Sequence, residues 1–478
     1  MKNVLEWFEA TVAKYPDKPA FSDTESSITF RQVYDIARNT GAYLVEQLGV
    51  DRTPIAVFAG RKMVTPAYFL GVVYAGRPYA PIDASLPDKR IEKILENLCP
   101  GAIVADRESR EHVESIVDEL AKAEGFDRPQ IFIAEDISRF EQVACADSNC
   151  KISESAGDAV TDSENDTDGG VVAGCAGKTD DSSRDMLAVV RRQMSMTDPL
   201  YIIYTSGSTG NPKGVMTSHL SLMTYINAYC DVMHIEESDV LGNQSPLDYI
   251  AAIRDIYLPL KTGCSTAIIP KEYFMEPNAL FDYMNDKKVS SVGWSVSAFT
   301  ILTSLGAFEE VGLKSLRKIC FSGSVMPCRV LRKWQENLPE AHFVNQYGPT
   351  EATASCTYYS VDHLVEEDEV LPIGKAYDNY RVFLIDEHGN DPAVGEQGEI
   401  CVCGPIMALG YYNDPERTAA AFTLNPLNRA YPERMYRTGD YGRLDEAGIL
   451  HFCGRMDRQI KHMGHRVELD EVEHAANV

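Results

Sequence analysis

A short polar segment, TSGSTGNPKGV at residues 205–215, follows an apolar run at 201–204. Its glycines expose backbone N–H groups, its hydroxyl residues add further donors, and Lys213 adds a positive charge. Ordering such a glycine-rich segment costs backbone entropy, so we expect a bound anion to offset that cost. The spacing G-x-x-G-x-x-K-G differs from the P-loop spacing G-x-x-x-x-G-K-[ST]. The segment therefore predicts a phosphate-binding loop of another kind, with a hairpin turn or a flexible linker as the alternative.

Strand-like and helix-like segments alternate on both sides of this loop. Helical periodicity covers residues 30–48, 217–233, 277–286 and 328–337, and strand-like apolar runs cover 54–59, 265–269 and 317–321. Strands that alternate with helices predict an α/β fold with a mostly parallel sheet covered on both faces. From about residue 370 the strands become shorter, as at 399–403, which predicts a smaller β-rich subdomain.

The composition is that of a globular protein with two or three subdomains: 478 residues, 44% hydrophobic and 24% charged. A net charge of −26 disfavours nucleic-acid binding. The sequence has no apolar run of about 18 residues, the length that would span a membrane, and no signal-peptide pattern at its N-terminus. Its 12 cysteines lack paired spacing. We therefore expect a cytoplasmic protein with reduced thiols.

One segment differs in composition from the rest of the chain. Residues 144–185 contain ten acidic residues against three basic ones and almost no large apolar residue. Such a segment cannot bury enough apolar surface to order itself, so we predict a disordered insertion here.

Five further motifs accompany the loop. They are SITFRQVYDIA (27–37), YAGRPYAPIDASLPDKRI (74–91), NQYGPTEAT (345–353), YRTGD (436–440) and GRMDRQIKHMGHRVELDEVE (454–473). With TSGSTGNPKGV they make essentially the whole chain resemble the adenylate-forming superfamily. The nearest branch is that of amino-acid adenylation domains of nonribosomal peptide synthetases and D-alanine:carrier-protein ligases.

The resemblance implies a two-step reaction. A carboxylic acid, expected to be an amino acid, would attack the α-phosphate of ATP to give an acyl-adenylate and pyrophosphate. The acyl group would then pass to the phosphopantetheine thiol of a carrier protein. Two alternatives remain: an acyl- or aryl-CoA ligase that uses free coenzyme A, and a catalytically silent nucleotide-binding module. The presence of Lys213, Glu351 and Asp440 argues against the silent module.

The resemblance also implies roles for single residues. Lys213, Thr209 and Glu351 would be catalytic, with Glu351 holding Mg²⁺ because this ion prefers carboxylate oxygen. The expected nucleotide-binding residues are Thr205, Ser206, Gly207, Ser208, Thr209, Gly210, Lys213, Asn345, Gln346, Tyr347, Gly348, Thr350, Asp440, Phe452, Arg455 and Lys461. Tyr347 would lie along the adenine, and Asp440 would accept hydrogen bonds from the ribose hydroxyls. Without the motifs, Asp440 would be interpreted as a turn cap and Arg455 as half of a surface ion pair.

The same resemblance predicts two domains. An N-terminal adenylation domain of αβ-layered subdomains would cover residues 1–457, with Asp457 as the hinge, and residues 458–478 would begin a C-terminal lid domain. Members of the superfamily continue for roughly a hundred residues more, a typical length for a small domain, and carry a catalytic lysine near that end. Because this sequence stops at Val478, we expect the chain to bind ATP but to form the adenylate poorly.

The acid-binding pocket would lie along SPLDYIAAIRDIY (245–257) and the sheet that follows it. Its expected lining is Asp248, Tyr249, Ile250, Ala251, Arg254, Trp294, Cys320, Ser322, Gly323, Gln346, Ala354 and Ser355. Amino-acid-activating members carry an aspartate, which pairs with the substrate's α-ammonium, where this chain has Ile250. Either the substrate lacks a free α-amino group and has an anionic or keto group that meets Arg254, or Asp248 replaces the missing aspartate. A third interpretation pairs Arg254 with Asp248 or Asp255, away from the substrate.

Two other groups of residues suggest chemistry less strongly. Cys401, Cys403, His451 and Cys453 have spacings found in zinc sites. Strand alternation, however, would place Cys401 and Cys403 on one buried face, so we expect them in the core. His219, just after the loop, is expected at the start of a helix rather than as a catalytic base.

Overall fold

The computed structural model describes residues 2–122, 125–139, 182–207 and 211–456, with the backbone alone of 459–462 and 465–468. The predicted insertion at 144–185 lies outside the described residues, except that its last residues begin helix α7 (Ser182–Gln193). The predicted loop residues Ser208, Thr209 and Gly210 and the predicted hinge Asp457 also lie outside them.

The largest sheet has nine strands in the order β15-β14-β13-β12-β11-β9-β10-β1-β2. They are β1 (Pro19–Ser22), β2 (Ser27–Thr29), β9 (Val240–Asn243), β10 (Ser265–Ile268), β11 (Ser291–Ser295), β12 (Lys318–Ser322), β13 (His342–Tyr347), β14 (Thr357–Ser360) and β15 (Lys375–Ala376). Strands β1 and β9 to β13 run parallel, whereas the pairs β1–β2, β13–β14 and β14–β15 are antiparallel. The residues that follow the parallel strands therefore gather at one edge of the sheet.

A second sheet has seven strands in the order β18-β8-β7-β4-β3-β5-β6. They are β3 (Ile55–Phe58), β4 (Tyr79–Pro81), β5 (Ala102–Ala105), β6 (Gln130–Ile133), β7 (Pro199–Thr205), β8 (Lys213–Ser218) and β18 (Gly410–Tyr411). Strands β3 to β7 are parallel, and β8 and β18 add antiparallel strands at one side.

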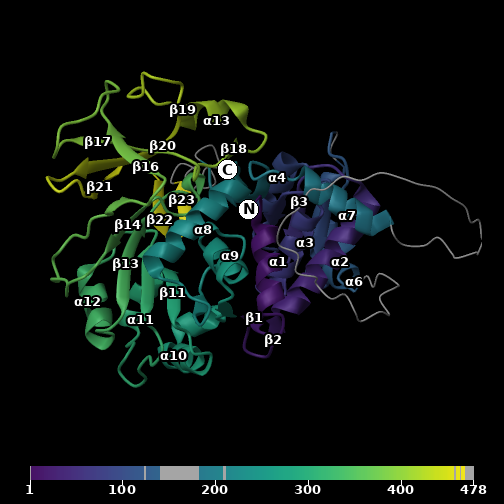
Figure 1. The fold of residues 1–478 in the computed structure, drawn as a ribbon, viewed down its shortest axis with the longest axis horizontal. Helices are drawn as coiled ribbons and strands as arrows, with labels where there is room; N and C mark the ends of the chain where they lie inside the picture. The colour runs from purple at the N-terminus through teal and green to yellow at the C-terminus, as the bar shows by residue number, and fades with distance from the viewer. Residues whose placement is uncertain are drawn as a thin grey trace, which may run out of the picture.

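The β-rich part lies at the upper left of Figure 1. Its antiparallel strands are β16 (Arg381–Ile385), β17 (Gln397–Cys403), β19 (Phe422–Leu424), β20 (Arg434–Leu444) and β21 (Leu450–Arg455). A separate hairpin joins β22 (Gln459–His462) to β23 (His465–Glu468). The expected change to a β-rich subdomain after about residue 370 is confirmed.

Helices surround both large sheets. They are α1 (Val4–Lys14), α2 (Phe30–Leu48), α3 (Thr65–Tyr74), α4 (Asp88–Leu98), α5 (Arg110–Leu120), α6 (Ala134–Ile137), α8 (His219–Met233), α9 (Ile253–Thr262), α10 (Pro277–Asp286), α11 (Val296–Ser304), α12 (Cys328–Asn337) and α13 (Pro415–Ala421), with short 3-10 turns η1 (Ile250–Ala252), η2 (Lys271–Met275) and η3 (Thr350–Ala352). The predicted helices at 30–48, 277–286 and 328–337 are confirmed, and so is the α/β class. None of the described helices is both long and apolar enough to cross a membrane.

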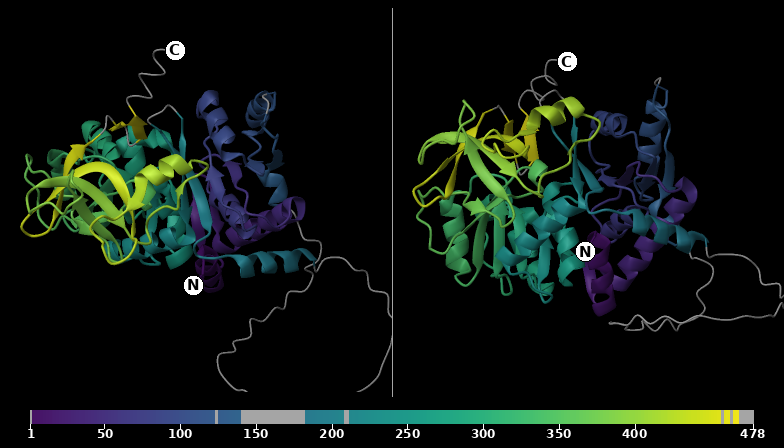
Figure 2. Two further views of the ribbon diagram at one scale, coloured as in Figure 1. Left: turned by 90° about the horizontal axis from the view of Figure 1, so that it is seen from above. Right: turned by 45° about the horizontal axis from the view of Figure 1, so that its top comes forward.

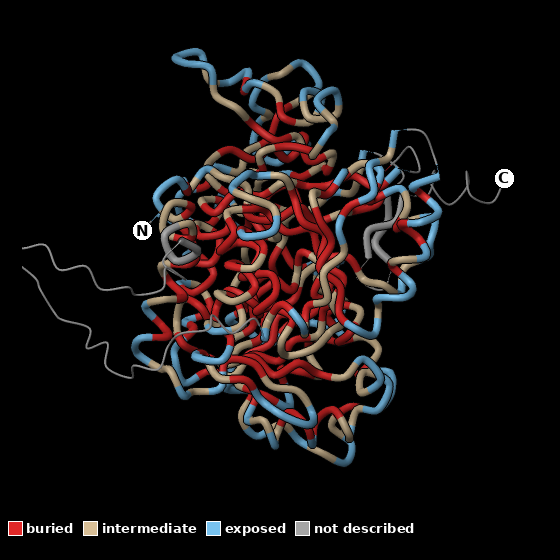
Figure 3. Tube along the Cα trace, turned by 90° about the vertical axis from the view of Figure 1, so that its right-hand side faces the viewer, coloured by how far each residue is buried: buried red, intermediate tan, exposed pale blue. Residues whose placement is uncertain are grey.

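Burial on both faces explains why the strands are continuously apolar. In β3, Ile55 and Val57 join the core beneath α2 and α3, whereas Ala56 and Phe58 join the core beneath α4 and α5. The first of these cores continues into the nine-stranded sheet. Phe21 on β1, Leu241 on β9 and Val344 on β13 belong to the same cluster as residues of α8 and α9. Figure 2 shows these helices between the two sheets, and Figure 3 shows the buried trace filling the interior. A single shared core therefore fixes the two sheets against each other.

Local signals set the helix ends. Helix α2 begins with a capping box, in which the Thr29 and Gln32 side chains bond each other's backbone N–H groups, and it ends at Gly49 with φ of 69°. Helix α8 begins at His219, two residues later than the predicted range 217–233, because β8 continues to Ser218 and the Ser218 side chain caps the helix. His219 thus lies at the helix start, as expected.

His219 provides a test of the fold. Burial lowers its pKa from 6.5 to about 4, with Asp198 opposing the shift and Arg191 adding to it. The unfolded chain therefore takes up this proton first, so stability is complete above about pH 6.5 and falls as the pH drops toward 4. We expect His219→Gln to remove this component, about 3 kcal/mol across the window.

Urea unfolding of the two proteins from pH 4 to 8 measures the difference in their stability profiles. Parallel profiles would show that His219 does not change its proton binding on folding.

Candidate active site

The predicted phosphate-binding loop connects β7 to β8 as a hairpin. Thr205 pairs with Lys213 across the two strands, so Lys213 lies at the base of the loop. Gly207 is needed here, because a Cβ at that position would meet the Asn211 carbonyl oxygen at 2.2 Å. Thr205 Oγ1 is buried without a hydrogen-bond partner in the described chain. The hairpin interpretation of the segment and the phosphate-loop interpretation are therefore compatible.

Lys213 forms a buried ion pair with Glu351. Its Nζ lies 2.9 Å from Glu351 Oε1, and the Glu351 side chain is 0% exposed. The Tyr411 hydroxyl donates to the same oxygen at 2.8 Å, and Lys213 Nζ lies 5.1 Å from the centre of the Tyr411 ring. Lys213, Glu351 and Tyr411 belong to β8, η3 and β18, so this contact joins the three elements. Two residues expected to be catalytic are thus in direct contact.

Sequence reasoning missed Tyr411. Its contact with Glu351 joins positions 60 residues apart, and no motif covered residues 410–412. The pairing of β18 with β8, in which Tyr411 lies opposite Val215, brings the hydroxyl to this place.

Tyr347, Asp440 and Arg455 form a second polar group. Asp440 on β20 lies opposite Arg455 on β21, and Arg455 Nη1 donates to Asp440 Oδ1 at 2.6 Å. The Tyr347 hydroxyl donates to Asp440 Oδ2. Burial, together with the nearby Asp440 charge, holds the pKa of Tyr347 well above its usual value. The Phe452 ring lies 6.2 Å from that of Tyr347. Four residues expected at the adenosine therefore gather at one place.

The other expected nucleotide residues follow β13 into η3. Asn345 Nδ2 donates to the Pro372 carbonyl at 2.8 Å, and Gln346 Nε2 donates to the Tyr377 hydroxyl at 2.7 Å. Gly348 allows close packing, since a Cβ there would lie 2.5 Å from Ser355 Cα. Thr350 is buried at the start of η3. Lys461 lies on β22, where the backbone alone is described.

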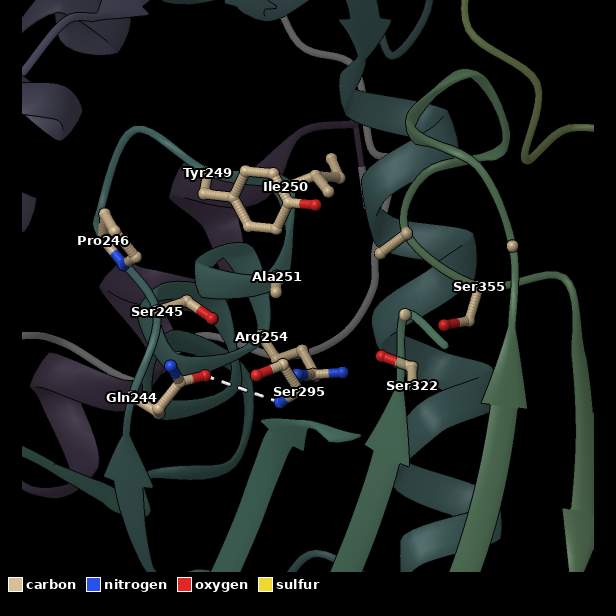
Figure 4. Close-up of a pocket in the computed structure, with 13 residues that line it drawn as sticks. Gln244, Ser245, Pro246, Tyr249, Ile250, Ala251, Arg254, Ser295, Ser322 and Ser355 are labelled. Atoms are coloured by element: carbon tan, nitrogen blue, oxygen red, sulfur yellow. Dashed lines mark hydrogen bonds between the residues drawn. The ribbon is translucent and has the colours of Figure 1, made fainter. Parts of the chain in front are cut away.

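A small cavity of about 60 Å³ lies at the carboxyl ends of β9, β11, β12 and β13 (Figure 4). Eight expected pocket residues line it: Tyr249, Ile250, Ala251, Arg254, Ser322, Gly323, Ala354 and Ser355. Five further residues line it that were not among the expected lining residues, although Ser245 and Pro246 belong to the predicted segment 245–257: Gln244, Ser245, Pro246, Ser295 and Gly348. Since Gln244 and Ser245 directly follow β9, and Ser295 ends β11, the carboxyl-end rule could have found them.

Four expected pocket residues do not line the cavity. Trp294 is buried, and its Nε1 donates to the Gly242 carbonyl at 2.8 Å. Cys320 Sγ lies 3.2 Å from the Tyr229 hydroxyl, and Gln346 is occupied with Tyr377. Asp248 lies near Asp83, and burial raises its pKa to about 6, with Asp83 contributing to the rise. The proposed replacement of the ammonium-binding aspartate by Asp248 would therefore need the segment to move.

Two of the three cysteines considered for zinc lie in the core, whereas Cys453 is exposed. Cys401 and Cys403 are buried on β17 beside Ile385 and Met435. His451 Nε2 lies 2.9 Å from Asp445 Oδ2 instead. Within the described residues, no group of three His, Cys, Asp or Glu side chains is arranged for a metal.

Glu351 fits the modest demands of Mg²⁺. This ion commonly binds through one or two carboxylates together with substrate phosphates, so it does not need a cage of protein ligands. Glu351 lies next to Lys213 at the base of the phosphate loop. Its chemistry and its place are therefore those of a residue that holds a phosphate-bound magnesium ion.

Comparison with known proteins defines the class. Residues 8–412 match the AMP-binding enzyme family. The chain belongs to this family and is an adenylate-forming ligase that uses ATP, which confirms the resemblance drawn from the motifs.

Individual relatives show which branch of the family the chain is similar to. A D-alanine--D-alanyl carrier protein ligase of Bacillus cereus (strain Q1) is 30% identical over 473 residues, which cover 98% of this chain and 82% of that protein. The corresponding ligase of Bacillus thuringiensis (strain Al Hakam) is 31% identical with the same coverage.

Solved structures share the fold. An artificially fused adenylation–PCP didomain of a nonribosomal peptide synthetase from Klebsiella oxytoca has a TM-score of 0.76 at 19% identity, covering 100% of this chain and 84% of that one. A nonribosomal peptide synthetase protein with adenylation and PCP domains, bound to a vinylsulfonamide inhibitor, has a TM-score of 0.74 at 24% identity, covering 100% of this chain and 72% of that one.

The Lys213–Glu351 pair leads to a stability prediction. Removing one partner leaves a buried charge uncompensated, so Lys213→Met or Glu351→Gln alone should cost about 3–5 kcal/mol. The double variant should cost much less than the sum of the two, because it leaves neither charge behind. Urea unfolding gives the free energy of unfolding of the wild type, the two single variants and the double variant.

The exposed pair Lys122–Glu119 is the matched control, and its cycle should give a coupling below about 1 kcal/mol. Additive losses at Lys213 and Glu351 would contradict the interpretation of a coupled buried pair.

Proposed function

We propose that this protein activates a small carboxylic acid as its acyl-adenylate and passes the acyl group to the phosphopantetheine thiol of a carrier protein. One observation carries the proposal: a single segment, 345–355, contributes to both the nucleotide residues and the acid cavity. Tyr347 and Glu351 belong to the two polar groups, and Gly348, Ala354 and Ser355 line the cavity. An acid held there would lie beside the phosphates of a nucleotide held by its neighbours.

The residues then have defined tasks in the first half-reaction. A carboxylate oxygen of the acid bonds to the α-phosphorus, and the bond from that phosphorus to the pyrophosphate oxygen breaks. Lys213 and the N–H groups of the loop offset the repulsion between the two anions and the charge that grows on pyrophosphate. Tyr347, Asp440 and Arg455 hold the adenosine so that the reacting atoms meet in line.

We infer that Mg²⁺ accompanies ATP and that Glu351 holds it, supplying charge neutralisation at the phosphates. For this, Glu351 must exchange part of its contact with Lys213 for the metal, while Lys213 turns toward a phosphate. The buried pair is thus interpreted as the resting arrangement of two groups that both serve the nucleotide.

The nature of the relatives supports the choice of acceptor. Their names specify a carrier protein, so we propose a carrier protein rather than free coenzyme A. We further propose a cytoplasmic location, an adenylation domain over 1–457 that contains the insertion at 144–185, and a lid domain that begins at 458 and turns about Asp457.

Asp440 tests the nucleotide site. Asp440→Asn removes the charge that accepts from Tyr347 and Arg455. Because hydrogen bonds to charged groups are worth about 1.5–3 kcal/mol, we expect ATP to bind roughly 10- to 100-fold more weakly. Titration calorimetry with ATP measures this.

Asp445→Asn is the matched control, since Asp445 lies in the turn after β20 and pairs with His451, away from the site. It should leave ATP affinity unchanged. Equal losses in both variants would place the nucleotide elsewhere.

The reaction itself is tested by acid-dependent exchange of labelled pyrophosphate into ATP. We expect exchange that requires an added acid and Mg²⁺, and thioester formation on a phosphopantetheinylated carrier protein. Exchange without added acid would argue against the first half-reaction. Thioester formed on coenzyme A and not on carrier proteins would instead favour the CoA-ligase alternative.

A further inference from the structure

The acid cavity contains a buried positive charge. Arg254, on the first turn of α9, lines the cavity and is only 2% exposed. Figure 4 shows its guanidinium among the serine side chains of the cavity floor. Burying a charge is costly unless an opposite charge or hydrogen bonds compensate it.

Arg254 has only neutral partners among the described residues. Its Nη2 donates to the Gly293 carbonyl, and its Nη1 lies 3.5 Å from Gln346 Oε1. The guanidinium carbon lies 5.7 Å from the centre of the Tyr229 ring. Among the described residues, its Nε has no hydrogen-bond partner. The guanidinium is therefore held by neutral groups, and the charge of Asp255 acts on it without forming a salt bridge.

Neither aspartate proposed as a partner pairs with Arg254. Asp255 Oδ2 accepts from Asn243 Nδ2 at 2.8 Å, and Asp248 faces Asp83 outside the cavity lining. Within the described part of the chain, no carboxylate forms a salt bridge with Arg254. The interpretation of Arg254 as half of a salt bridge with Asp248 or Asp255 is therefore not supported, although the charge of the neighbouring Asp255 still attracts the guanidinium.

The surroundings keep the guanidinium in place. A Cβ at position 293 would lie 2.7 Å from Arg254 Cζ, so Gly293 on β11 leaves the space that the side chain occupies. Two more polar groups lie near this end of the pocket: Ser355 Oγ, which lines the cavity, and the Tyr225 hydroxyl, which interacts with Arg254 and Ser355. Among the described residues, neither hydroxyl nor Arg254 Nε has a hydrogen-bond partner of good geometry, so all three can still bond to a ligand.

The cavity offers no carboxylate to an ammonium group. Among the described residues its lining contains no Asp or Glu, and Ile250 contributes an apolar side chain. An amino acid's α-ammonium would be desolvated beside a positive guanidinium with no counter-charge, an arrangement that disfavours binding.

We propose that the acid activated here is a short dicarboxylic acid without an α-amino group, and that Arg254 is the specificity-determining residue that binds its second carboxylate. The inference rests on the proposed function, since it names the substrate class of that site. The second carboxylate completes the hydrogen bonds of Arg254 and supplies the missing negative charge. The cavity volume of about 60 Å³ favours an acid of few carbons.

The test compares acids that differ in one group. Succinate and butyrate have equal chain length and differ by one carboxylate, and D- and L-alanine represent amino acids. We measure the pyrophosphate exchange rate of the full chain with each acid, and the shift that each acid causes in its unfolding temperature with ATP present. Wild-type protein should prefer succinate to butyrate about 100-fold, the value expected for one charge-assisted contact, and should prefer it to both alanines.

Variants identify Arg254 as the source of the preference. Arg254→Met should lower the response to succinate about 100-fold while changing that to butyrate less than about threefold. Arg254→Lys should retain an intermediate preference, because it keeps the charge but loses the fork. The matched control is Arg61→Met: Arg61 also donates to a neutral partner, Asn243, at 2.9 Å, but does not line the cavity. It should leave the preference unchanged.

The outcomes distinguish a failure of the dicarboxylate assignment from a failure of the proposed adenylating function. A wild-type preference for either alanine, or an equal loss for all acids in Arg254→Met, overturns the dicarboxylate assignment and leaves the adenylating function standing. A chain that neither binds ATP nor responds to any acid in its presence overturns the proposed function itself. The unfolding-temperature shift provides the comparison even where exchange is slow.

Discussion

The buried ion pair between Lys213 and Glu351 is the constraint on which the site depends. Lys213 belongs to the hairpin of the seven-stranded sheet, whereas Glu351 follows β13 of the nine-stranded sheet, so the pair links the two sheets. Because Glu351 is fully buried, its charge is stable there only while a cation or donor faces it. Lys213 is this cation, and the Tyr411 hydroxyl is this donor. In the proposed function, a phosphate that attracts Lys213 would have to bring a replacement cation for Glu351, which would couple nucleotide and metal binding at this point.

The segment from Asn345 to Ser355 serves both halves of the site. It ends β13, passes through η3 and carries residues that face the adenosine group on one side and the acid cavity on the other. Gly348 allows this because the chain packs against Ser355 too closely for a side chain. In the proposed function, one stretch of backbone would position both substrates, so their relative placement would not depend on the movement of one sheet against the other.

The nucleotide end and the acid end of the site differ in how their charges are compensated. At the nucleotide end, the residues expected from the motifs have charges that compensate one another in the structure. At the acid end, Ile250 stands where the resemblance implies an aspartate, and Arg254 adds a positive charge to the lining. The curated relatives are named for D-alanine, an acid that carries an ammonium group. The reversed polarity of this cavity is the physical reason to expect a different acid.

The sequence by itself determined the class of protein, the α/β elements and the motif residues, because periodicity and motif spacing are local properties of the chain. It predicted helices at 30–48 and near 277–286 that match α2 and α10, since the capping residue Thr29, the first-turn Pro277 and the apolar faces are all local in the chain. Tertiary structure alone decided that Tyr411 reaches Glu351, that Trp294 and Cys320 lie outside the cavity lining, and that Arg254 forms no salt bridge among the described residues. These facts depend on strand order and on packing between distant segments, and local sequence carries no record of either.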